Sequence, residues 1–300
     1  MSKITVLKLK NHLRRELQVI HTLELLKQIA ASEFHYLEKQ KKEASQFVRL
    51  LESFFNFYQS KHLTAGFFSE EPSSIPAMIA ITSDEGFLGA LNNLIVEKAV
   101  QFYRENPGTN LVVLGRRGAR KIRDFGIEPV EFPGIPFPLE YQAVLPLKKY
   151  LMDLYTANRI GSIHVIYARC HSFTKQTLEV TNLLPYNMLG NQRPEDETEL
   201  DTVIMEPDIE QIIQYTIALC FGRQLYEIFW DSKLSEVAAR TIELNERYEH
   251  LSKSSEKVRM QYFRASHEVI DAGIREIFSS QHFSRQQKKA KAAEVSHVSG

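Results

Sequence analysis

This chain of 300 residues has few cysteines, no excess of one charge and no long apolar run. Cys170 and Cys220 are the only cysteines, which argues against a disulfide framework and a cysteine-based metal motif. Lys and Arg together number 37, as do Asp and Glu, so no global field favours nucleic acid as a partner. The longest apolar stretches, such as 76–82, are too short to span a membrane directly. Because the first residues lack the apolar core of a signal peptide, we expect a cytoplasmic protein.

Proline and glycine are missing from long stretches at both ends of the sequence. All 11 prolines fall between residues 72 and 207, and the first glycine is Gly66. Because Pro and Gly break helices, this segregation predicts a helix, a mixed domain and a second helix. We expect a helix over 1–65, an α/β domain over 74–200, a helix over 206–283 and a polar, disordered tail over 284–300.

A heptad pattern runs through the C-terminal helical segment. From Leu234 to Val269, apolar and small residues alternate at spacings of three and four without a slip. Such a seam makes a helix wind around a partner helix, and the apolar stripe of the N-terminal segment is the obvious candidate. The expected seam residues are Leu17, Ile20, Leu234, Val237, Leu244, Leu251, Val258, Tyr262 and Val269.

The length of the C-terminal segment indicates an extended element. A helix over 208–283 would reach roughly 110 Å at the standard rise per residue. A globular domain of this chain length has a radius of gyration of only about 20 Å. We therefore expect an antiparallel pair of terminal helices that projects as a coiled coil.

The middle of the chain has the pattern of a Rossmann-like α/β domain. Short β-branched runs predict buried strands over 77–82, 111–114 and 163–167. Helix-like stretches alternate with them, over 92–104, 118–125 and 141–157. This alternation implies a parallel sheet with crossover helices, inserted between the terminal helices. A further strand over 177–184 is a candidate for the sheet edge.

No motif for catalysis or cofactor binding is complete in this domain. Glycine pairs follow two of the strands, at 86–89 and 115–118, but neither completes G-x-G-x-x-G, and no phosphate-binding loop is present. We interpret these glycines as residues of tight strand-to-helix turns. Asp84 and Glu85 follow the first strand, and capping of the next helix is favoured over a catalytic role. We expect no catalytic residue, no cofactor and no metal site.

Three motifs, in this order, resemble the gamma subunit of bacterial F-type ATP synthases. Residues 27–33 are similar to K-M-V-A-A-S-K, residues 83–92 to the turn S-D-x-G-L-x-G-x-x-N, and residues 235–240 to S-E-x-A-A-R. The residues of the turn that match are Ser83, Asp84, Gly86, Gly89 and Asn92. The resemblance covers almost the whole chain, with departures that leave open a divergent second copy such as the alternate (N-type) synthase of some bacteria. Glu33 and Glu85 stand where the family has Lys and Arg, and an Arg-Gln pair that contacts the catalytic subunits is replaced within 262–267.

The resemblance implies a central rotor shaft that couples ion flow to ATP synthesis or hydrolysis. Its implied partners are the alpha and beta subunits of the catalytic hexamer, the epsilon subunit and the ring of c subunits, at the cytoplasmic face of the bacterial inner membrane. The implied contacts to the catalytic ring are Lys27, Ile29, Arg264, His267 and Glu276. Two alternatives remain open: a coiled-coil scaffold or adaptor outside a rotary complex, and an α/β enzyme acting through the middle domain.

Overall fold

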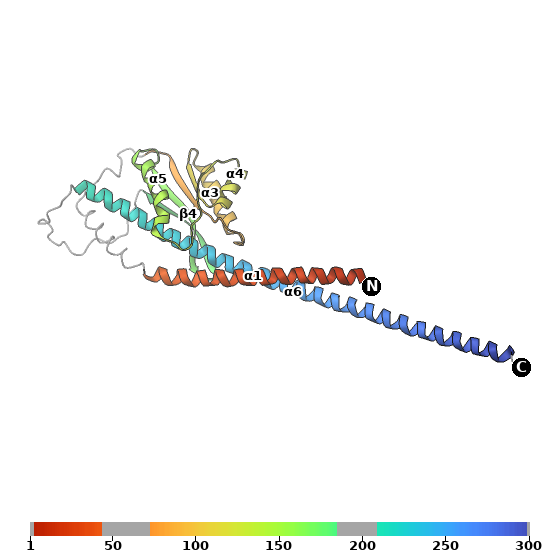
Figure 1. Ribbon diagram of the computed structural model, residues 1–300. Helices are drawn as coiled ribbons and strands as arrows, with labels where there is room; N and C mark the ends of the chain where they lie inside the picture. Colours follow the sequence, from red (N-terminus) through yellow and green to blue (C-terminus); the bar gives the residue numbers. More distant parts are fainter. Residues whose placement is uncertain (1–2, 44–72, 185–208, 299–300) are drawn as a thin grey trace. The chain divides into compact units, whose positions relative to one another are not determined.

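The computed structural model describes residues 3–43, 73–184 and 209–298. The chain divides into two compact units (Figure 1). One unit comprises residues 1–26 with 244–300, and the other comprises residues 27–243. The long helices α1 (Lys3–Glu43) and α6 (Ile209–Val298) each contribute residues to both units. We call them the coiled-coil unit and the α/β unit.

The α/β unit is built on one five-stranded sheet of order β3-β2-β1-β4-β5. Its strands are β1 (Pro76–Ile81), β2 (Asn110–Leu114), β3 (Val130–Phe132), β4 (Ser162–Ser172) and β5 (Lys175–Leu184). β1, β2, β3 and β4 pair in parallel, and β5 pairs antiparallel with β4 at the edge. The three predicted strands and the edge strand are confirmed. The short strand β3 was not predicted, because Val-Glu-Phe is too brief to give a pattern.

Three crossover helices connect the parallel strands, as the sequence predicts. They are α3 (Leu91–Glu105), α4 (Arg116–Asp124) and α5 (Leu145–Thr156), and a 3-10 turn η1 (Tyr141–Val144) precedes α5. Pro146 lies in the first turn of α5, where the missing N–H costs no helical hydrogen bond. The central part of β1 is fully buried, and α3 and α4 pack one side of it with Ile95, Val96, Ala99 and Ile122.

Both terminal segments form long unbroken helices. The described part of α1 ends at Glu43, so residues 44–65 of the predicted N-terminal helix lie outside the described residues. α6 spans 90 residues and ends at Val298. The expected disordered tail over 284–300 is therefore corrected, because α6 continues through most of it. The physical reason is composition: the segment contains no Pro or Gly before Gly300 and is rich in Ala, Lys and Gln, which favour helix.

In the coiled-coil unit, burial along α6 follows the heptad spacing. Leu244, Ser255 and Ala265 are buried, and the other seam positions, Tyr248, Leu251, Val258, Tyr262 and Val269, are half-buried. Figure 1 shows α1 and α6 running in opposite directions in this unit. Among the described residues of the molecule, no helix combines the length and the apolarity that a bilayer crossing requires.

The seam of α1 differs from the predicted one at one position, where Glu16 stands in place of Leu17. Leu17 is 53% exposed and Leu26 is 38% exposed, whereas Leu23 is buried and Glu16 and Ile20 are half-buried. Including Leu17 in the seam was therefore wrong. The reason is that a strict three-four alternation that includes Ile20 and Leu23 passes through residue 16, which is acidic and therefore does not appear in an apolar pattern. Oε1 of Glu16 accepts a hydrogen bond of 3.3 Å from Oγ of Ser254 on α6, so the contact here is polar.

Candidate functional site

The turn that follows β1 is held by side chains of the residues singled out in the sequence. The Ser83 amide donates to Oδ1 of Asn92 on α3, at 3.2 Å, and Oγ of Ser83 accepts from the Glu85 amide, at 3.0 Å. Thr82 Oγ1 donates to the carbonyl oxygen of Leu114 at the end of β2, at 2.6 Å. Ser83 and Asn92 thus fix the loop between β1 and α3, and Thr82 joins it to the neighbouring strand.

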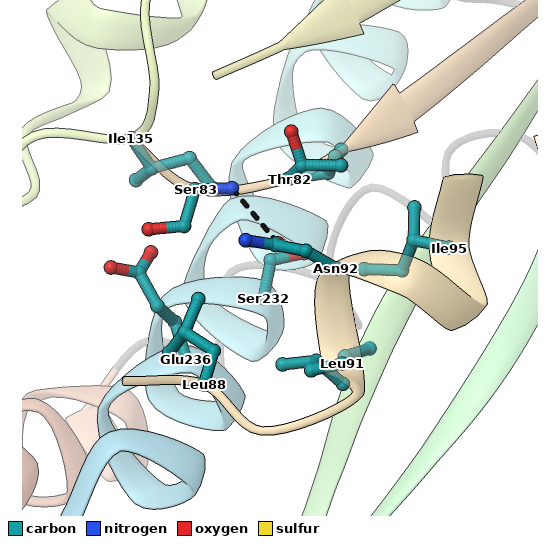
Figure 2. Close-up of a pocket in the computed structure, with 11 residues that line it drawn as sticks. Thr82, Ser83, Leu88, Leu91, Asn92, Ile95, Ile135, Ser232 and Glu236 are labelled. Carbon is teal, nitrogen blue, oxygen red and sulfur yellow. Dashed lines mark hydrogen bonds between the residues drawn. The ribbon is translucent and has the colours of Figure 1, made fainter. Parts of the chain in front are cut away.

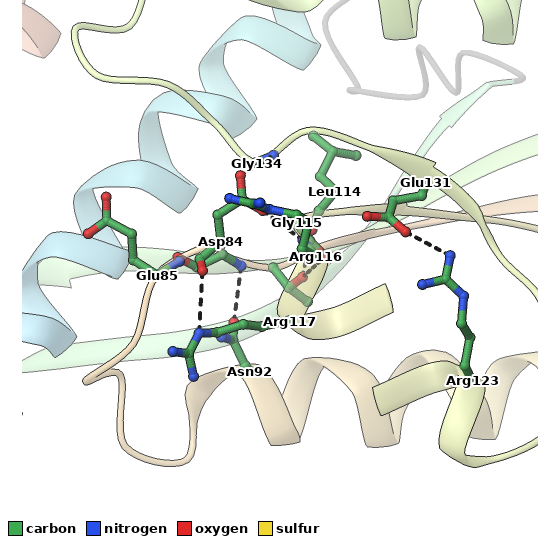
Figure 3. A network of polar contacts seen from close by, with 12 residues as sticks. Asp84, Glu85, Asn92, Leu114, Gly115, Arg116, Arg117, Arg123, Glu131 and Gly134 are labelled. Atoms are coloured by element: carbon green, nitrogen blue, oxygen red, sulfur yellow. Dashed lines mark hydrogen bonds and ion pairs between the residues drawn. The ribbon is translucent and has the colours of Figure 1, made fainter. Parts of the chain in front are cut away.

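Asp84 connects this turn to α4 and to the loop after β3 (Figure 3). Oδ1 accepts from the amide of Arg116, at 2.7 Å, and from Nε of the same residue, at 3.4 Å. Oδ2 accepts from the amide of Gly134, at 3.0 Å. The expectation that Asp84 and Glu85 cap the helix that follows them is wrong: α3 has Ala90 at its N-cap with no side-chain bond, and Asp84 binds the first turn of α4. The sheet order decides this, because it places the ends of β1 and β2 side by side.

The environment of Asp84 favours its ionised form. Burial by itself would raise the pKa of this carboxyl, but hydrogen bonds from the Arg116 and Gly134 amides and the positive charge of Arg116 outweigh burial and lower the pKa. A carboxylate that accepts several N–H groups is therefore a permanent charged anchor at neutral pH.

Two glycines of these turns adopt a backbone conformation that side-chain-bearing residues rarely adopt. Gly89 has a φ of 53° and Gly115 has a φ of 95°, both in the left-handed region. At Gly115 a Cβ atom would also lie 2.7 Å from the carbonyl oxygen of Thr82. The interpretation of these glycines as residues of tight turns agrees with this geometry.

Arg240 of α6 is a buried residue at the centre of an ionic cluster in the α/β unit. Its Nη1 lies 2.9 Å from Oε2 of Glu85 and 3.8 Å from Oε2 of Glu33 on α1, and its Nη2 donates to Oε1 of Glu236. Lys233 Nζ lies 3.1 Å from the same Glu236 oxygen. The cluster therefore joins α1, the turn after β1 and α6. We call these five residues the ionic junction.

The ionic junction contains three carboxylates and two cations. Glu33 is affected by this imbalance. Its partial burial raises its pKa, Arg240 and Lys233 lower it, and Glu85 and Glu236 raise it, with a net increase. Arg240 is 8% exposed, and its Nε has no hydrogen-bond partner among the described residues. A buried guanidinium of this kind is costly once a partner is removed.

Helix α6 covers the place where doubly wound domains usually bind ligands. In such sheets the ligand lies beyond the carboxyl ends of the strands, where the strand order reverses, here between β1 and β4. Ser235 of α6 donates from Oγ to the carbonyl oxygen of Ala168 on β4, at 2.9 Å. The cavity that remains has a volume of about 10 Å³ (Figure 2). Among the described residues, no group of three or more potential metal ligands is present either.

The sequence-predicted residues fall into three groups in the structure. The turn residues come together around Asp84, as described above. Of the seam residues in the α/β unit, Leu234 and Val237 are buried. Of the expected contacts to a catalytic ring, Lys27 is half-buried, and the others are exposed: Ile29, Arg264, His267 and Glu276.

Sequence reasoning missed the ionic junction as a unit. Glu236 and Arg240 belong to a quoted motif, and their spacing of four residues is that of a helical ion pair, which was the available signal. Glu33 and Glu85 were noted only as departures from motifs. Their common partner could not be read from the sequence, because three distant segments supply the cluster.

The fold and the junction define a class of protein in which an α/β domain is inserted between two long helices and fastened to both of them. Residues 13–282 match the family described as ATP synthase, so the chain belongs to that family. It is 27% identical over 201 residues to the ATP synthase gamma chain of Clostridium acetobutylicum, covering 66% of this chain and 69% of the relative. It is 28% identical over 226 residues to that of Clostridium novyi, covering 72% and 76%.

Solved structures share the fold. A chain in the cryo-EM structure of the Euglena gracilis mitochondrial ATP synthase (OSCP/F1/c-ring) is similar with a TM-score of 0.65 and 15% identity, covering 96% of this chain and 97% of that one. A chain in the central stalk and c-ring structure of the Tetrahymena thermophila mitochondrial ATP synthase has a TM-score of 0.58 and 16% identity, covering 75% and 99%.

Proposed function

We propose that the chain is the gamma subunit of a bacterial F-type ATP synthase and acts as its central rotor shaft. The family match and the relatives named ATP synthase gamma chain support this role. The observation that carries the mechanical part is the continuity of α6. This one helix of 90 residues enters the core of the α/β unit and forms the seam of the coiled-coil unit without a break. A rotation applied to the domain is therefore transmitted without a flexible linker.

A shaft must also resist slippage of the domain against its helices. In the α/β unit, α6 is held by the ionic junction and by the bond from Ser235 to Ala168 of β4. Leu234 and Val237 bury their side chains alongside these polar contacts. Directional bonds from several elements restrict rotation about the helix axis more than apolar packing does, because apolar packing is non-directional.

The proposed partners are the alpha and beta subunits, the epsilon subunit and the ring of c subunits, at the cytoplasmic face of the inner membrane. Exposed apolar residues on the C-terminal part of α6 support a sleeve-like partner around it: Ile270, Ile274, Ile277 and Phe278 are exposed by 46–68%. Lys27, Ile29, Arg264, His267 and Glu276 stay predicted contacts to the catalytic subunits.

We also propose that the subunit itself is not catalytic. Its support is the position of α6, whose Ser235 and Glu236 occupy the region that a nucleotide takes in related sheets. Thermal-shift measurements with ATP, ADP and nicotinamide nucleotides test this proposal directly. A saturable stabilisation that survives removal of the alpha and beta subunits would favour the enzyme alternative.

Reconstitution tests the rotor role. We expect the chain to co-purify stoichiometrically with alpha and beta subunits, and the complete complex to pump ions on ATP hydrolysis. Replacing the half-buried seam residues with Leu251→Asp and Val258→Asp should leave hydrolysis and reduce pumping. Lys253→Asp with Met260→Asp, at exposed positions of the same helix and the same spacing, is the matched control. Absence of co-purification would favour a scaffold, and full coupling in the seam variant would contradict the seam as stiffener.

A further inference from the structure

A small cavity lies where the turn after β1, α3 and α6 meet (Figure 2). Its volume is about 10 Å³. That volume is close to the minimum that one water molecule needs, and it is far below the volume of a nucleotide or a metabolite. The cavity therefore admits a single water-sized occupant.

One buried hydroxyl group in this cavity lacks a partner. Ser232 of α6 is 6% exposed, and its Oγ makes no hydrogen bond to any described residue. Buried hydroxyl groups in proteins are nearly always hydrogen-bonded, to protein or to ordered water. Ser235, three residues further along α6, is buried too but is satisfied by the carbonyl oxygen of Ala168.

Four other polar residues line the same cavity: Thr82, Ser83, Asn92 and Glu236. Oδ1 of Asn92 already accepts from the Ser83 amide, and its Nδ2 carries two further donors. Both ion-pair contacts of Glu236 fall on Oε1, and Oε2 is the second acceptor of that carboxylate. The cavity thus offers a donor, an acceptor and a hydroxyl that can be either, which suits a water molecule that makes about three hydrogen bonds.

We propose that this cavity is a specific binding site for one structural water molecule. The water accepts from Asn92, donates to Glu236 and exchanges a hydrogen bond with Ser232. It thereby links α3 to α6 beside the ionic junction, and it satisfies the hydroxyl that the protein leaves unpaired. The site makes the joint between the domain and the helix a hydrated one.

The sign of a stability change tests the proposal. If the water is bound, Ser232→Ala removes one of its partners and should lower the ratio of folded to unfolded full-length chain about two- to tenfold. If the cavity is dry, the same substitution removes an unpaired buried hydroxyl and should raise that ratio. Ser235→Ala is the matched control on the same helix, and it should lower the ratio in either case.

A high-resolution map of the full chain, alone or in its complex, gives the second readout. We expect a density peak within hydrogen-bond distance of Ser232 Oγ, Asn92 Nδ2 and Glu236, retained in Ser232→Ala and lost in Ser232→Val, whose methyl groups fill the cavity. An empty cavity in a map that resolves other buried waters would overturn the proposal. So would a Ser232 hydroxyl that donates to a carbonyl of its own helix.

Discussion

Nη1 of Arg240 and Oε2 of Glu85 lie 2.9 Å apart, although one residue belongs to α6 and the other to the turn after β1. Glu85 is largely exposed and Arg240 is buried, so the pair connects the interior of the unit to its surface. Glu33 and Glu236 complete the surroundings of the guanidinium. This relationship makes Arg240 the residue on which three elements of the α/β unit depend.

Replacement of Arg240 should therefore be among the most disruptive single changes in the unit. Arg240→Ala leaves Glu236 buried beside Lys233 alone, and we expect a loss of about 3–5 kcal/mol in the free energy of unfolding. Urea unfolding followed by circular dichroism measures this. Arg259→Ala, an exposed position on the same helix, is the control, expected within about 0.5 kcal/mol of the parent chain. If the two changes lower the free energy of unfolding equally, the ionic junction has no special role in stability.

Glu33 should make the stability of the fold fall as the pH rises from acid towards neutrality. Its pKa in the folded state is raised above the ordinary value of 4.5, mainly by burial, so the fold binds this proton more tightly than the unfolded chain does. The stability that the protonated group contributes is present below pH 4.5 and is lost as the pH rises through the folded pKa. Glu33→Gln should abolish this loss, so that the variant gains stability relative to the parent chain between pH 4.5 and neutrality. If the difference in unfolding free energy between the variant and the parent chain does not change with pH over that range, the raised pKa of Glu33 is contradicted.

Asp84 predicts the reverse pH dependence. Its folded pKa is below the ordinary value of 3.8, so the stability that its hydrogen bonds contribute is present above pH 3.8 and is lost as the pH falls through the folded pKa. Asp84→Asn should cost about 1–2 kcal/mol at neutral pH and flatten the acid limb of the stability curve. Asp124→Asn at the end of α4 is an exposed control. If stability falls equally steeply at acid pH in the parent chain and in Asp84→Asn, the role of Asp84 as a charged anchor is contradicted.

Gly115 should tolerate alanine less well than Gly108, although both have positive φ values, 95° and 88°. A Cβ at Gly115 meets the backbone of Thr82 at 2.7 Å, whereas a Cβ at Gly108 meets nothing within 4 Å. We expect Gly108→Ala to cost about 1–2 kcal/mol from backbone strain alone. Gly115→Ala should cost about 1–3 kcal/mol more from the forced displacement. Thermal and urea unfolding of the two variants measure the difference, and equal costs would show that the close approach is relieved.

The register of α1 can be tested with two leucines of the coiled-coil unit. Leu23 is 7% exposed and Leu17 is 53% exposed. Leu23→Ala should destabilise the chain by about 2 kcal/mol or more, because a cavity is left in the seam. Leu17→Ala should change the stability by less than about 0.5 kcal/mol. A larger effect at Leu17 would restore the register that the apolar pattern suggested.

Much of the fold could be read from the sequence because it depends on local features. The absence of Pro and Gly before residue 66, and of Pro after Pro207, predicts two long helices. The β-branched runs at 77–82, 111–114 and 163–167 predict the buried parallel strands. In the coiled-coil unit, the heptad spacing predicts the burial pattern of α6, because one helix face determines which residues are covered.

The tertiary structure alone decided what the polar residues do. Glu16 rather than Leu17 lies on the seam, because packing follows the helix face and accepts a charged residue that finds a partner in Ser254. Asp84 binds α4 instead of α3, the helix that follows it in the sequence. Glu33, Glu85 and Glu236 share Arg240 as a partner. Hydrophobic periodicity is a property of one segment, whereas an ion pair or a hydrogen bond requires two segments to meet within about 3 Å. Only the packed sheet and helices determine which segments meet.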